Sequence, residues 1–299
     1  MHKHDRNGDI PIEVVVGCFG LIPSYLRKTL FRGLWRLFYH LSPRHRFIAV
    51  HNLHRSFPDK SMAEIVKIAK GAYRNLAFVS AEFFDLPRLN PERLNRILEI
   101  EGMENLQTAL GKKKGILLFG AHFGNWELMA VAASQFTGPM TAIYRPLDNP
   151  FLDRVVRYVR SSTGNIVVPK RRAMLQMLRA LDKGGAVGVL IDQNVSWREG
   201  IFVDFFGRPA CTTDGLAQMA LRTEAPVIPA FIVRKSDGRY RLIIGEEVEM
   251  VRTGDRDDDV RVNTQKFTGV IEDMIRQYPD QWLWLHNRWK TKVHQLRKR

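Results

Sequence analysis

The pattern of apolar and polar residues along the chain predicts a protein in which strands and helices alternate. Short apolar runs such as Ile116–Phe119 are typical of buried strands, whereas apolar residues three and four positions apart indicate helices. Strands are predicted over residues 98–101, 116–119, 140–144, 166–168, 186–191, 227–233 and 241–244. Helices are predicted over residues 62–86, 103–110, 150–161, 171–181, 214–222 and 260–277. This alternation predicts an α/β sheet covered by helices.

The N-terminal part of the chain has a different pattern. Val14–Leu26 is uncharged but short for a membrane-spanning helix, which needs ~20 residues. Lys28, Arg32 and Arg36 then recur every four residues as a basic stripe. Beside them lies a broad apolar side, made of Leu30, Phe31, Leu34, Trp35, Leu37, Phe38 and Leu41. Such a helix lies in a membrane interface, with its cations at anionic headgroups and its aromatic rings at the acyl boundary. A helix docked on the protein core is the alternative; we predict a membrane-associating segment over residues 1–41.

The charge balance of the chain narrows the choice of partners. A formal net charge of +15 favours an acidic partner, such as nucleic acid, anionic lipid, an acidic carrier protein or a phosphorylated substrate. No zinc-finger spacing or RNA-binding aromatic motif is present, so nucleic acid is not expected. The two cysteines, Cys18 and Cys211, lack the spacing of a disulfide framework or a zinc site. We therefore predict no metal or other cofactor.

One stretch concentrates the candidate chemistry. The strand predicted over residues 116–119 is followed by a glycine-flanked turn with His122 and by an apolar helix with Glu127. Residues five apart on one helix point ~140° away from each other, so the pair meets only if His122 precedes the helix. A carboxylate on one imidazole nitrogen leaves the other nitrogen free as a general base. The alternative is a histidine at a helix start and a surface glutamate favoured by the helix dipole.

Charged residues also follow two other predicted strands. Arg145 ends the strand over residues 140–144, where α/β proteins bind ligands, and its planar fork suits a phosphate. Arg160 lies on the next predicted helix and offers a second cation. Asp192 stands at the end of another strand. We predict that Arg145, Arg160 and Asp192 bind substrate; ordinary surface arginines would give the same pattern.

Several of these residues belong to an ordered set of motifs that resembles the late acyltransferases of lipid A biosynthesis, within the lysophospholipid acyltransferase superfamily. The likeness extends over roughly residues 20–291. The motifs are His122-x4-Glu127, Tyr144-Arg145-Pro146, Asp192-Gln193, Phe205-Phe206-Gly207, the Ala225–Pro229 strand, Asn52-x3-Ser56-Phe57-Pro58 and the tryptophan-rich Gln281–Lys290 segment. Glutamate at position 127 is usual in the lipid A branch, whereas Asp192-Gln193-Asn194 departs from the Asp-His-Asp of its best-known members.

The resemblance implies a mixed central sheet flanked by helices and an acyltransferase domain over residues 42–299. It further implies transfer of a fatty acyl chain from an acyl carrier protein to a hydroxyl of a lipid A precursor, at the cytoplasmic face of a bacterial inner membrane. His122, held by Glu127, would act as the base. No Gly-x-Ser-x-Gly elbow is present, so a covalent acyl-serine is not indicated.

Two alternatives remain open at this point. One is an acyltransferase for another phospho- or glycolipid, using acyl-CoA or a carrier protein. Mannoside acyltransferases of the same superfamily share the histidine–acid pair. The other is a basic protein that binds membranes or nucleic acid, in which His122 and Glu127 are incidental.

Overall fold

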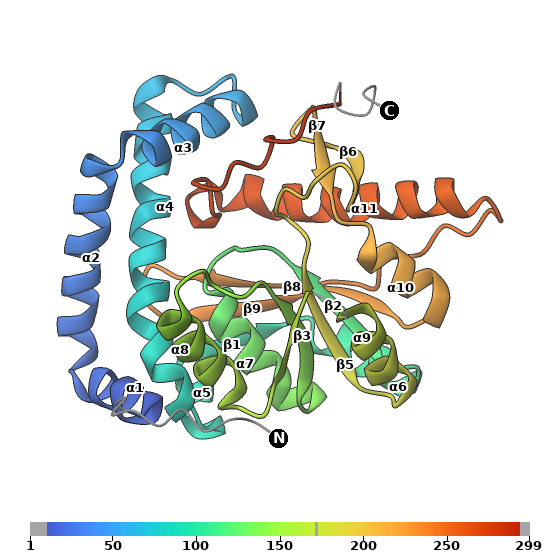
Figure 1. Ribbon diagram of the computed structural model, residues 1–299, viewed down its shortest axis with the longest axis horizontal. Coiled ribbons are helices and arrows are strands. Elements are labelled where there is room, and N and C mark those ends of the chain that lie inside the picture. The colour runs from blue at the N-terminus through green and yellow to red at the C-terminus, as the bar shows by residue number, and fades with distance from the viewer. Residues whose placement is uncertain (1–10, 171–172, 294–299) are drawn as a thin grey trace.

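The computed structural model describes residues 11–170 and 173–293 and confirms the α/β architecture (Figure 1). The strands are β1 (Leu98–Glu101), β2 (Ile116–Gly120), β3 (Met140–Tyr144), β4 (Ile166–Pro169), β5 (Ala186–Leu190), β6 (Ile201–Phe205), β7 (Arg208–Thr212), β8 (Val227–Arg234) and β9 (Tyr240–Ile244). The helices are α1 (Ile12–Leu21), α2 (Ser24–Leu41), α3 (Pro43–Ser56), α4 (Met62–Glu82), α5 (Pro91–Ile97), α6 (Met103–Gly111), α7 (Trp126–Thr137), α8 (Pro150–Ser161), α9 (Ala173–Asp182), α10 (Gly215–Thr223) and α11 (Arg256–Gln277), with short 3-10 turns η1 (Phe83–Arg88) and η2 (Pro279–Gln281).

The central sheet is mixed, as the family resemblance implies. Its seven strands lie in the order β1-β9-β8-β2-β5-β3-β4. All neighbouring pairs are parallel except β8 and β9, which are antiparallel. The carboxyl ends of β2, β5, β3 and β4 therefore meet at one edge of the sheet, the edge where α/β proteins bind ligands.

Both faces of the sheet are covered, which explains why its central strand reads as a continuous apolar run. Every residue of β2 is buried. Leu117 and Phe119 belong to the core formed with α9, α10 and α11, whereas Ile116 and Leu118 belong to the core formed with α6, α7 and α8. Successive side chains of a strand point to opposite faces, so a strand between two helical layers has no polar face.

The strands of the sheet fall at their predicted positions to within a residue or so, but other elements differ, and α11 begins at Arg256, four residues before its predicted start. Residues 200–213, for which no strand is predicted, contain the antiparallel hairpin of β6 and β7. The helix expected over residues 62–86 ends as α4 at Glu82 and continues as η1 through Pro87. Proline interrupts helical hydrogen bonding, which accounts for the tighter final turn. The predicted helix start at Arg171 and Arg172 lies outside the described residues.

Helix α2 confirms the predicted amphipathic pattern but orients it differently from our expectation. The aromatic residues Phe31, Trp35 and Phe38 face the protein, where the Trp35 indole N–H donates to Ser80 Oγ at 3.0 Å and the Phe38 ring lies 6.2 Å from the Tyr73 ring. The prediction that these rings lie at the acyl boundary is therefore wrong. The outward face instead carries exposed leucines, namely Leu26, Leu30, Leu34, Leu37 and Leu41.

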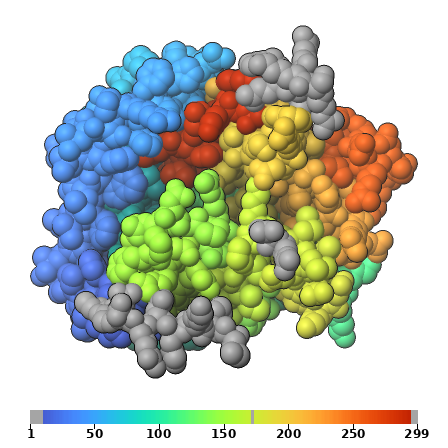
Figure 2. Space-filling model, in the orientation of Figure 1, coloured from blue at the N-terminus to red at the C-terminus, as the bar shows by residue number. Residues whose placement is uncertain are grey.

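The N-terminal helices form one flank of the molecule. In Figures 1 and 2 this blue flank runs along one side, with α2 beside α4. No single helix within the described ranges is long and apolar enough to cross a membrane, and α1 and α2 meet the length and composition criteria only as a pair bent by 101°. The division of the chain after residue 41 stays a prediction.

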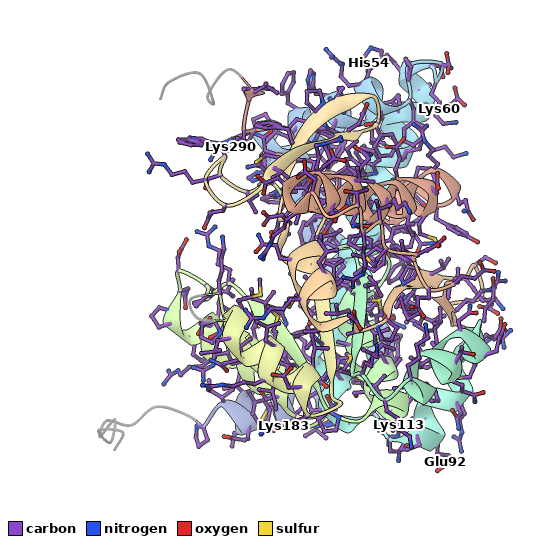
Figure 3. All side chains as sticks on the ribbon, turned by 90° about the vertical axis from the view of Figure 1, so that its right-hand side faces the viewer. His54, Lys60, Glu92, Lys113, Lys183 and Lys290 are labelled. Carbon is purple, nitrogen blue, oxygen red and sulfur yellow. The ribbon has the colours of Figure 1, made fainter. Side chains whose placement is uncertain are left out.

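Positive charge is spread over the surface. Lys60 and Lys290 lie at one end of the molecule, whereas Lys113 and Lys183 lie at the opposite end (Figure 3). The net charge of +15 is therefore not confined to one patch. Charge alone does not locate a docking surface.

Candidate active site

The turn between β2 and α7 places His122 at the carboxyl edge of the sheet. The side chain of Asn125 caps α7 by accepting a hydrogen bond from the Leu128 N–H. Gly124 has a φ of +58°, and a Cβ atom there would lie 1.6 Å from the Ile232 carbonyl oxygen. Only glycine fits this close approach, so Gly124 allows the turn to pack against β8.

The carboxylate that holds His122 belongs to Asp192 and not to Glu127. His122 Nδ1 lies 2.8 Å from Asp192 Oδ1, and the His122 backbone N–H donates to Asp192 Oδ2 at 3.0 Å. The expected contact between His122 and Glu127 is therefore wrong. Asp192 follows β5, which pairs directly with β2, so the topology brings together two residues that lie 70 positions apart in the sequence.

Asp192 is buried with both oxygens engaged. Its Oδ2 also accepts a hydrogen bond from the Trp282 indole N–H at 2.8 Å, and the residue is 3% exposed. Burial alone would raise the pKa of this carboxyl, but the charge and hydrogen bonds of His122 and the bond from Trp282 lower it to about 2. The carboxylate is ionised at neutral pH, and both of its oxygens accept hydrogen bonds from within the protein, so its role in binding substrate stays a prediction.

Glu127 and Arg160 form a second pair, which the sequence did not predict. Arg160 Nε donates to Glu127 Oε2 at 2.9 Å, and its Nη2 donates to Oε1 at 2.5 Å. Burial alone would lower the pKa of Arg160, but the Glu127 charge and hydrogen bonds raise it. The guanidinium of Arg160, which the sequence predicts to bind substrate, is thus engaged by Glu127 within the protein. Glu127 also accepts from the Trp126 indole N–H at 3.0 Å, and the Trp126 ring lies 5.4 Å from the His122 ring.

The tryptophan-rich C-terminal segment holds the His122 turn in place. The Leu283 N–H donates to the His122 carbonyl at 3.1 Å, and the Gly124 N–H donates to the Gln281 carbonyl at 2.8 Å. Trp282 is 2% exposed and supplies the donor to Asp192 described above. The segment therefore anchors both members of the histidine–aspartate pair, which gives the motif a structural role.

The residues after Asp192 are anchored by the same segment. The Asn194 N–H donates to His286 Nε2 at 2.8 Å, and the Thr291 N–H donates to Asn194 Oδ1 at 3.0 Å. Fully buried Arg288 donates to the Gln193 carbonyl at 3.4 Å and to the Cys211 carbonyl at 2.7 Å. The backbone around the site is therefore fixed on both sides of Gln193.

His286 predicts a pH dependence of stability. Burial first, and then the charges of Arg288 and His122, lower its pKa from 6.5 to about 4 despite an opposing effect of Asp192. Between these values the unfolded chain binds a proton that the native protein does not, so the free energy of unfolding falls as pH falls through this window. The contribution is fully present above pH 6.5 and is about 3 kcal/mol at most.

Chemical denaturation between pH 7 and 4 measures this slope. The variant His286→Gln keeps an acceptor for the Asn194 N–H but does not titrate, so its slope should be shallower by about one proton at its steepest. The exposed His54, changed to glutamine, is the matched control and should leave the slope unchanged. Equal slopes in wild type and His286→Gln would contradict the assignment.

Arg145 is free, as a ligand-binding residue would be. It follows β3, which lies beside β5 at the same edge of the sheet as His122. The guanidinium is exposed, and none of the residues that the structure describes forms a hydrogen bond or ion pair with it. Adjacent strands are ~4.8 Å apart, so the end of β3 lies about 10 Å from that of β2. This is within reach of a ligand bound at His122.

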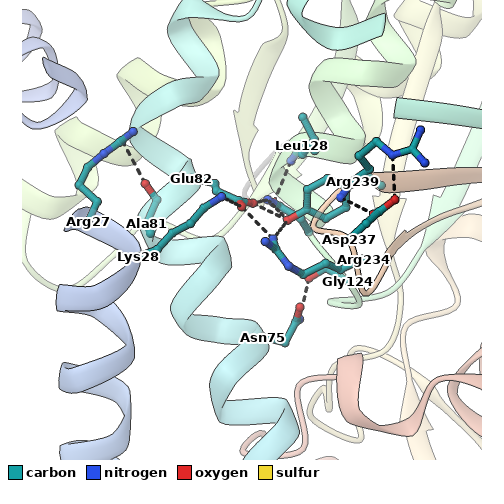
Figure 4. A network of polar contacts seen from close by, with 12 residues as sticks. Arg27, Lys28, Asn75, Ala81, Glu82, Gly124, Leu128, Arg234, Asp237 and Arg239 are labelled. Atoms are coloured by element: carbon teal, nitrogen blue, oxygen red, sulfur yellow. Dashed lines mark hydrogen bonds and ion pairs between the residues drawn. The ribbon is translucent and has the colours of Figure 1, made fainter. Parts of the chain in front are cut away.

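A partly buried carboxylate connects the turn to the N-terminal flank (Figure 4). Glu82, on α4, receives hydrogen bonds from Arg234 at 2.8 Å and from the cap residue Asn125 at 2.9 Å, and also from the Tyr240 hydroxyl. Lys28 of α2 lies 3.0 Å from the same carboxylate. One member of the predicted basic stripe therefore faces the protein and not the headgroups.

Two other candidate functions find little support in the geometry. Cys211 is fully buried, and burial raises the pKa of its thiol, which fits a small packing residue and not a catalytic thiolate. Among residues 11–170 and 173–293, no group of three histidine, cysteine, aspartate or glutamate side chains is arranged to hold a metal ion. The site contains instead a histidine oriented by a buried carboxylate, which is the arrangement of a general base.

Comparisons with known proteins indicate the family to which the chain belongs. Residues 12–291 match the family model of bacterial lipid A biosynthesis acyltransferases. The chain is 30% identical over 284 residues to the lipid A biosynthesis lauroyltransferase of Escherichia coli K12, covering 93% of this chain and 90% of that protein. It is 29% identical over 251 residues to the lipid A biosynthesis palmitoleoyltransferase of the same strain, covering 83% of this chain and 80% of that protein. A phosphatidylinositol mannoside acyltransferase of Mycolicibacterium smegmatis is 27% identical over 212 residues, covering 70% of this chain and 67% of that protein.

The chain belongs to the bacterial lipid A biosynthesis acyltransferase family, as its sequence motifs predict. It is an acyltransferase. The alternative of a non-enzymatic basic binding protein is thereby set aside.

Proposed function

We propose that the protein transfers a fatty acyl chain from an acyl carrier protein thioester to a hydroxyl of a lipid A precursor. The observation that carries this proposal is the pair formed by His122 and Asp192 at the carboxyl edge of the sheet. Asp192 accepts a hydrogen bond from the Nδ1–H of His122, which leaves the lone pair of the imidazole on Nε2. This nitrogen removes the proton of the acceptor hydroxyl, and the hydroxyl oxygen attacks the thioester directly.

Glu127 supports the reaction without touching the imidazole. Its carboxylate fixes the Arg160 guanidinium and the Trp126 indole, and the Trp126 ring packs edge-on beside His122. A rigid aromatic neighbour limits the motion of the base. Glu127 is therefore proposed as a positioning residue.

The donor and acceptor are supported by charge and by the relatives. A protein with a net charge of +15 attracts an acidic carrier protein over a distance. The two relatives from Escherichia coli are lipid A biosynthesis enzymes by their names, and we propose a phosphorylated lipid A precursor as the acceptor here. Because one relative is named a phosphatidylinositol mannoside acyltransferase, another glycolipid is the second candidate for the acceptor.

A reconstituted reaction tests the proposal. The purified protein is incubated with acyl carrier protein or CoA thioesters of several chain lengths and with an under-acylated lipid A precursor or a phosphatidylinositol mannoside. We expect acyl transfer from the carrier protein to the lipid A precursor, detected as a mass increase of one acyl chain. Transfer only from CoA would show that CoA and not the carrier protein is the donor. Transfer only to the mannoside would show that the lipid A precursor is not the acceptor.

Arg145 is proposed to bind a phosphate of the acceptor. Because a charge-assisted hydrogen bond contributes about 1.5–3 kcal/mol, Arg145→Ala should raise the apparent KM for the acceptor roughly ten- to a hundred-fold. Arg145→Lys should recover only part of this, since a point charge cannot make a two-pronged contact. Steady-state kinetics with each substrate varied in turn measures the effect. A defect confined to the KM of the donor would show instead that Arg145 binds the carrier protein or its phosphopantetheine phosphate.

We also propose that α2 holds the protein on the cytoplasmic face of the inner membrane. Three of its outward leucines, Leu30, Leu34 and Leu37, are about half exposed, at 51%, 49% and 54%. Burying a leucine side chain contributes about 1.5–3 kcal/mol, so changing all three to serine should weaken binding to anionic vesicles at least ten-fold.

Vesicle sedimentation measures this binding. Exposed apolar residues elsewhere, Met62, Ile166 and Leu175, provide a matched triple-serine control that should bind like wild type. If both triple variants bind equally well, α2 is not the membrane-binding element.

A further inference from the structure

The side chain of Gln193 contacts the free nitrogen of the proposed base. Gln193 Nε2 lies 3.3 Å from His122 Nε2. The Asp192 carboxylate only accepts hydrogen bonds, so His122 Nδ1 carries the proton and Nε2 carries the lone pair. The amide of Gln193 is therefore the donor in this contact, and its NH2 group points at the place where the acceptor hydroxyl must bind.

The position of this amide is set by the backbone. Gln193 lies between Asp192, which is bound by His122 and Trp282, and Asn194, which is bound by His286 and Thr291. Among the described residues, no further hydrogen bond engages the Gln193 side chain. The amide group is thus attached to a rigid segment and has a second N–H that is free for a ligand.

Three consecutive backbone N–H groups of the turn are already used. Those of His122, Phe123 and Gly124 donate to Asp192 Oδ2, to the Ala121 carbonyl and to the Gln281 carbonyl. None of the three is available to a substrate oxygen. The Gln193 amide is left as a hydrogen-bond donor in direct contact with the catalytic nitrogen.

We propose that Gln193 is a catalytic residue, whose amide donates a hydrogen bond to the thioester carbonyl oxygen as that oxygen becomes negatively charged. This inference rests on the proposed function. An acceptor hydroxyl must displace the Gln193 amide from His122 Nε2, because that nitrogen has a single lone pair. The displaced N–H then lies about one hydrogen bond from the attacking oxygen, near the carbonyl under attack.

The reaction proceeds in two balanced steps. First, His122 Nε2 takes the hydroxyl proton, the new C–O bond forms, and the carbonyl π electrons move to the oxygen that Gln193 stabilises. Second, the carbonyl re-forms, the C–S bond breaks, and the leaving sulfur takes the proton from His122. The products are the acylated acceptor and the free thiol, with no oxidation or reduction.

Three variants test the assignment in the reconstituted reaction, and two of them match the size of glutamine. Gln193→Met keeps the length of the side chain but has no N–H donor. Removal of one oxyanion donor lowers kcat about 10²- to 10³-fold, and the KM for both substrates should change little. Gln193→Glu replaces the donor by a carboxylate, so it should lose at least as much, and its pH–rate profile should shift upward because the new charge stabilises protonated His122. Gln193→His, which keeps an N–H donor, should recover part of the rate.

A donor with sulfur in place of the carbonyl oxygen gives an independent readout, because an anionic sulfur accepts hydrogen bonds poorly. The ratio of the rates with the oxygen and sulfur donors should be larger for wild type than for Gln193→Met. Equal ratios, or a kcat of Gln193→Met close to that of wild type while its melting temperature is unchanged, would overturn the assignment alone. Absence of acyl transfer by wild type with every donor would overturn the proposed function and the assignment with it.

Discussion

The variant His122→Ala is expected to lose nearly all acyl transfer while remaining folded. Removal of a general base lowers the rate about 10²- to 10⁴-fold, and here the imidazole also returns the proton to the leaving sulfur. The fold should tolerate the change, since the turn is held by backbone bonds to Gln281 and Leu283 and by Gly124. The loss should fall on kcat and leave the KM for the donor little changed.

The measurement compares steady-state rates of purified His122→Ala and wild type, with thermal unfolding as a check on folding. His54→Ala changes an exposed histidine on α3 and is the matched control, which should keep wild-type activity. Turnover by His122→Ala within a few-fold of wild type would rule out His122 as the base.

The variant Asp192→Asn is expected to have the second-largest effect. In enzymes that hold a histidine by a buried carboxylate, the corresponding change lowers kcat about 10⁴-fold, and we expect about 10³-fold or more here. The amide is neutral and stabilises the imidazolium less. It also has an N–H2 group that favours a proton on Nε2 of His122, which removes the basic lone pair from the reaction side.

Asp182→Asn, at the exposed end of α9, is the matched control for this variant. Glu127→Gln provides the direct comparison, because the sequence favours Glu127 as the partner of His122 and the geometry favours Asp192. We expect Glu127→Gln to lose less kcat than Asp192→Asn. A larger loss for Glu127→Gln would show that Glu127 moves onto the imidazole when substrates bind, and would restore the pairing that the sequence predicts.

The pH dependence of stability separates Asp192 from His286. The pKa of Asp192 is about 2 in the native protein against 3.8 normally, so its contribution is present above pH 3.8 and is lost as pH falls toward 2. The contribution of His286 to stability is lost at higher pH, as the pH falls from 6.5 to about 4. In acid denaturation, the free energy of unfolding should therefore fall in two separate pH ranges, one from 6.5 to about 4 and one from 3.8 to about 2.

The sequence by itself determined the fold class and the edge at which the site lies. Strands such as β2 are buried on both faces and read as continuous apolar runs, so their positions were predictable from local residue types. His122, Arg145 and Asp192 each follow such a strand, and parallel strands present their carboxyl ends at one edge. The ordered motifs also identified the family, which the comparisons confirm.

Only the tertiary structure decided which of these residues touch. His122 pairs with Asp192 because β2 and β5 are neighbours in the sheet, and the order of strands is not encoded in the spacing of residues along the chain. Glu127 is five residues from His122 in the sequence, but its carboxylate pairs with Arg160 on α8. The local backbone conformation at the start of α7 sets the direction of this side chain, and residue spacing alone does not reveal it. Likewise, the aromatic rings of α2 are buried against α4, and its leucines are left outside. Hydrophobic periodicity defines an apolar side, but the shape of the neighbouring helix decides which part of that side is buried.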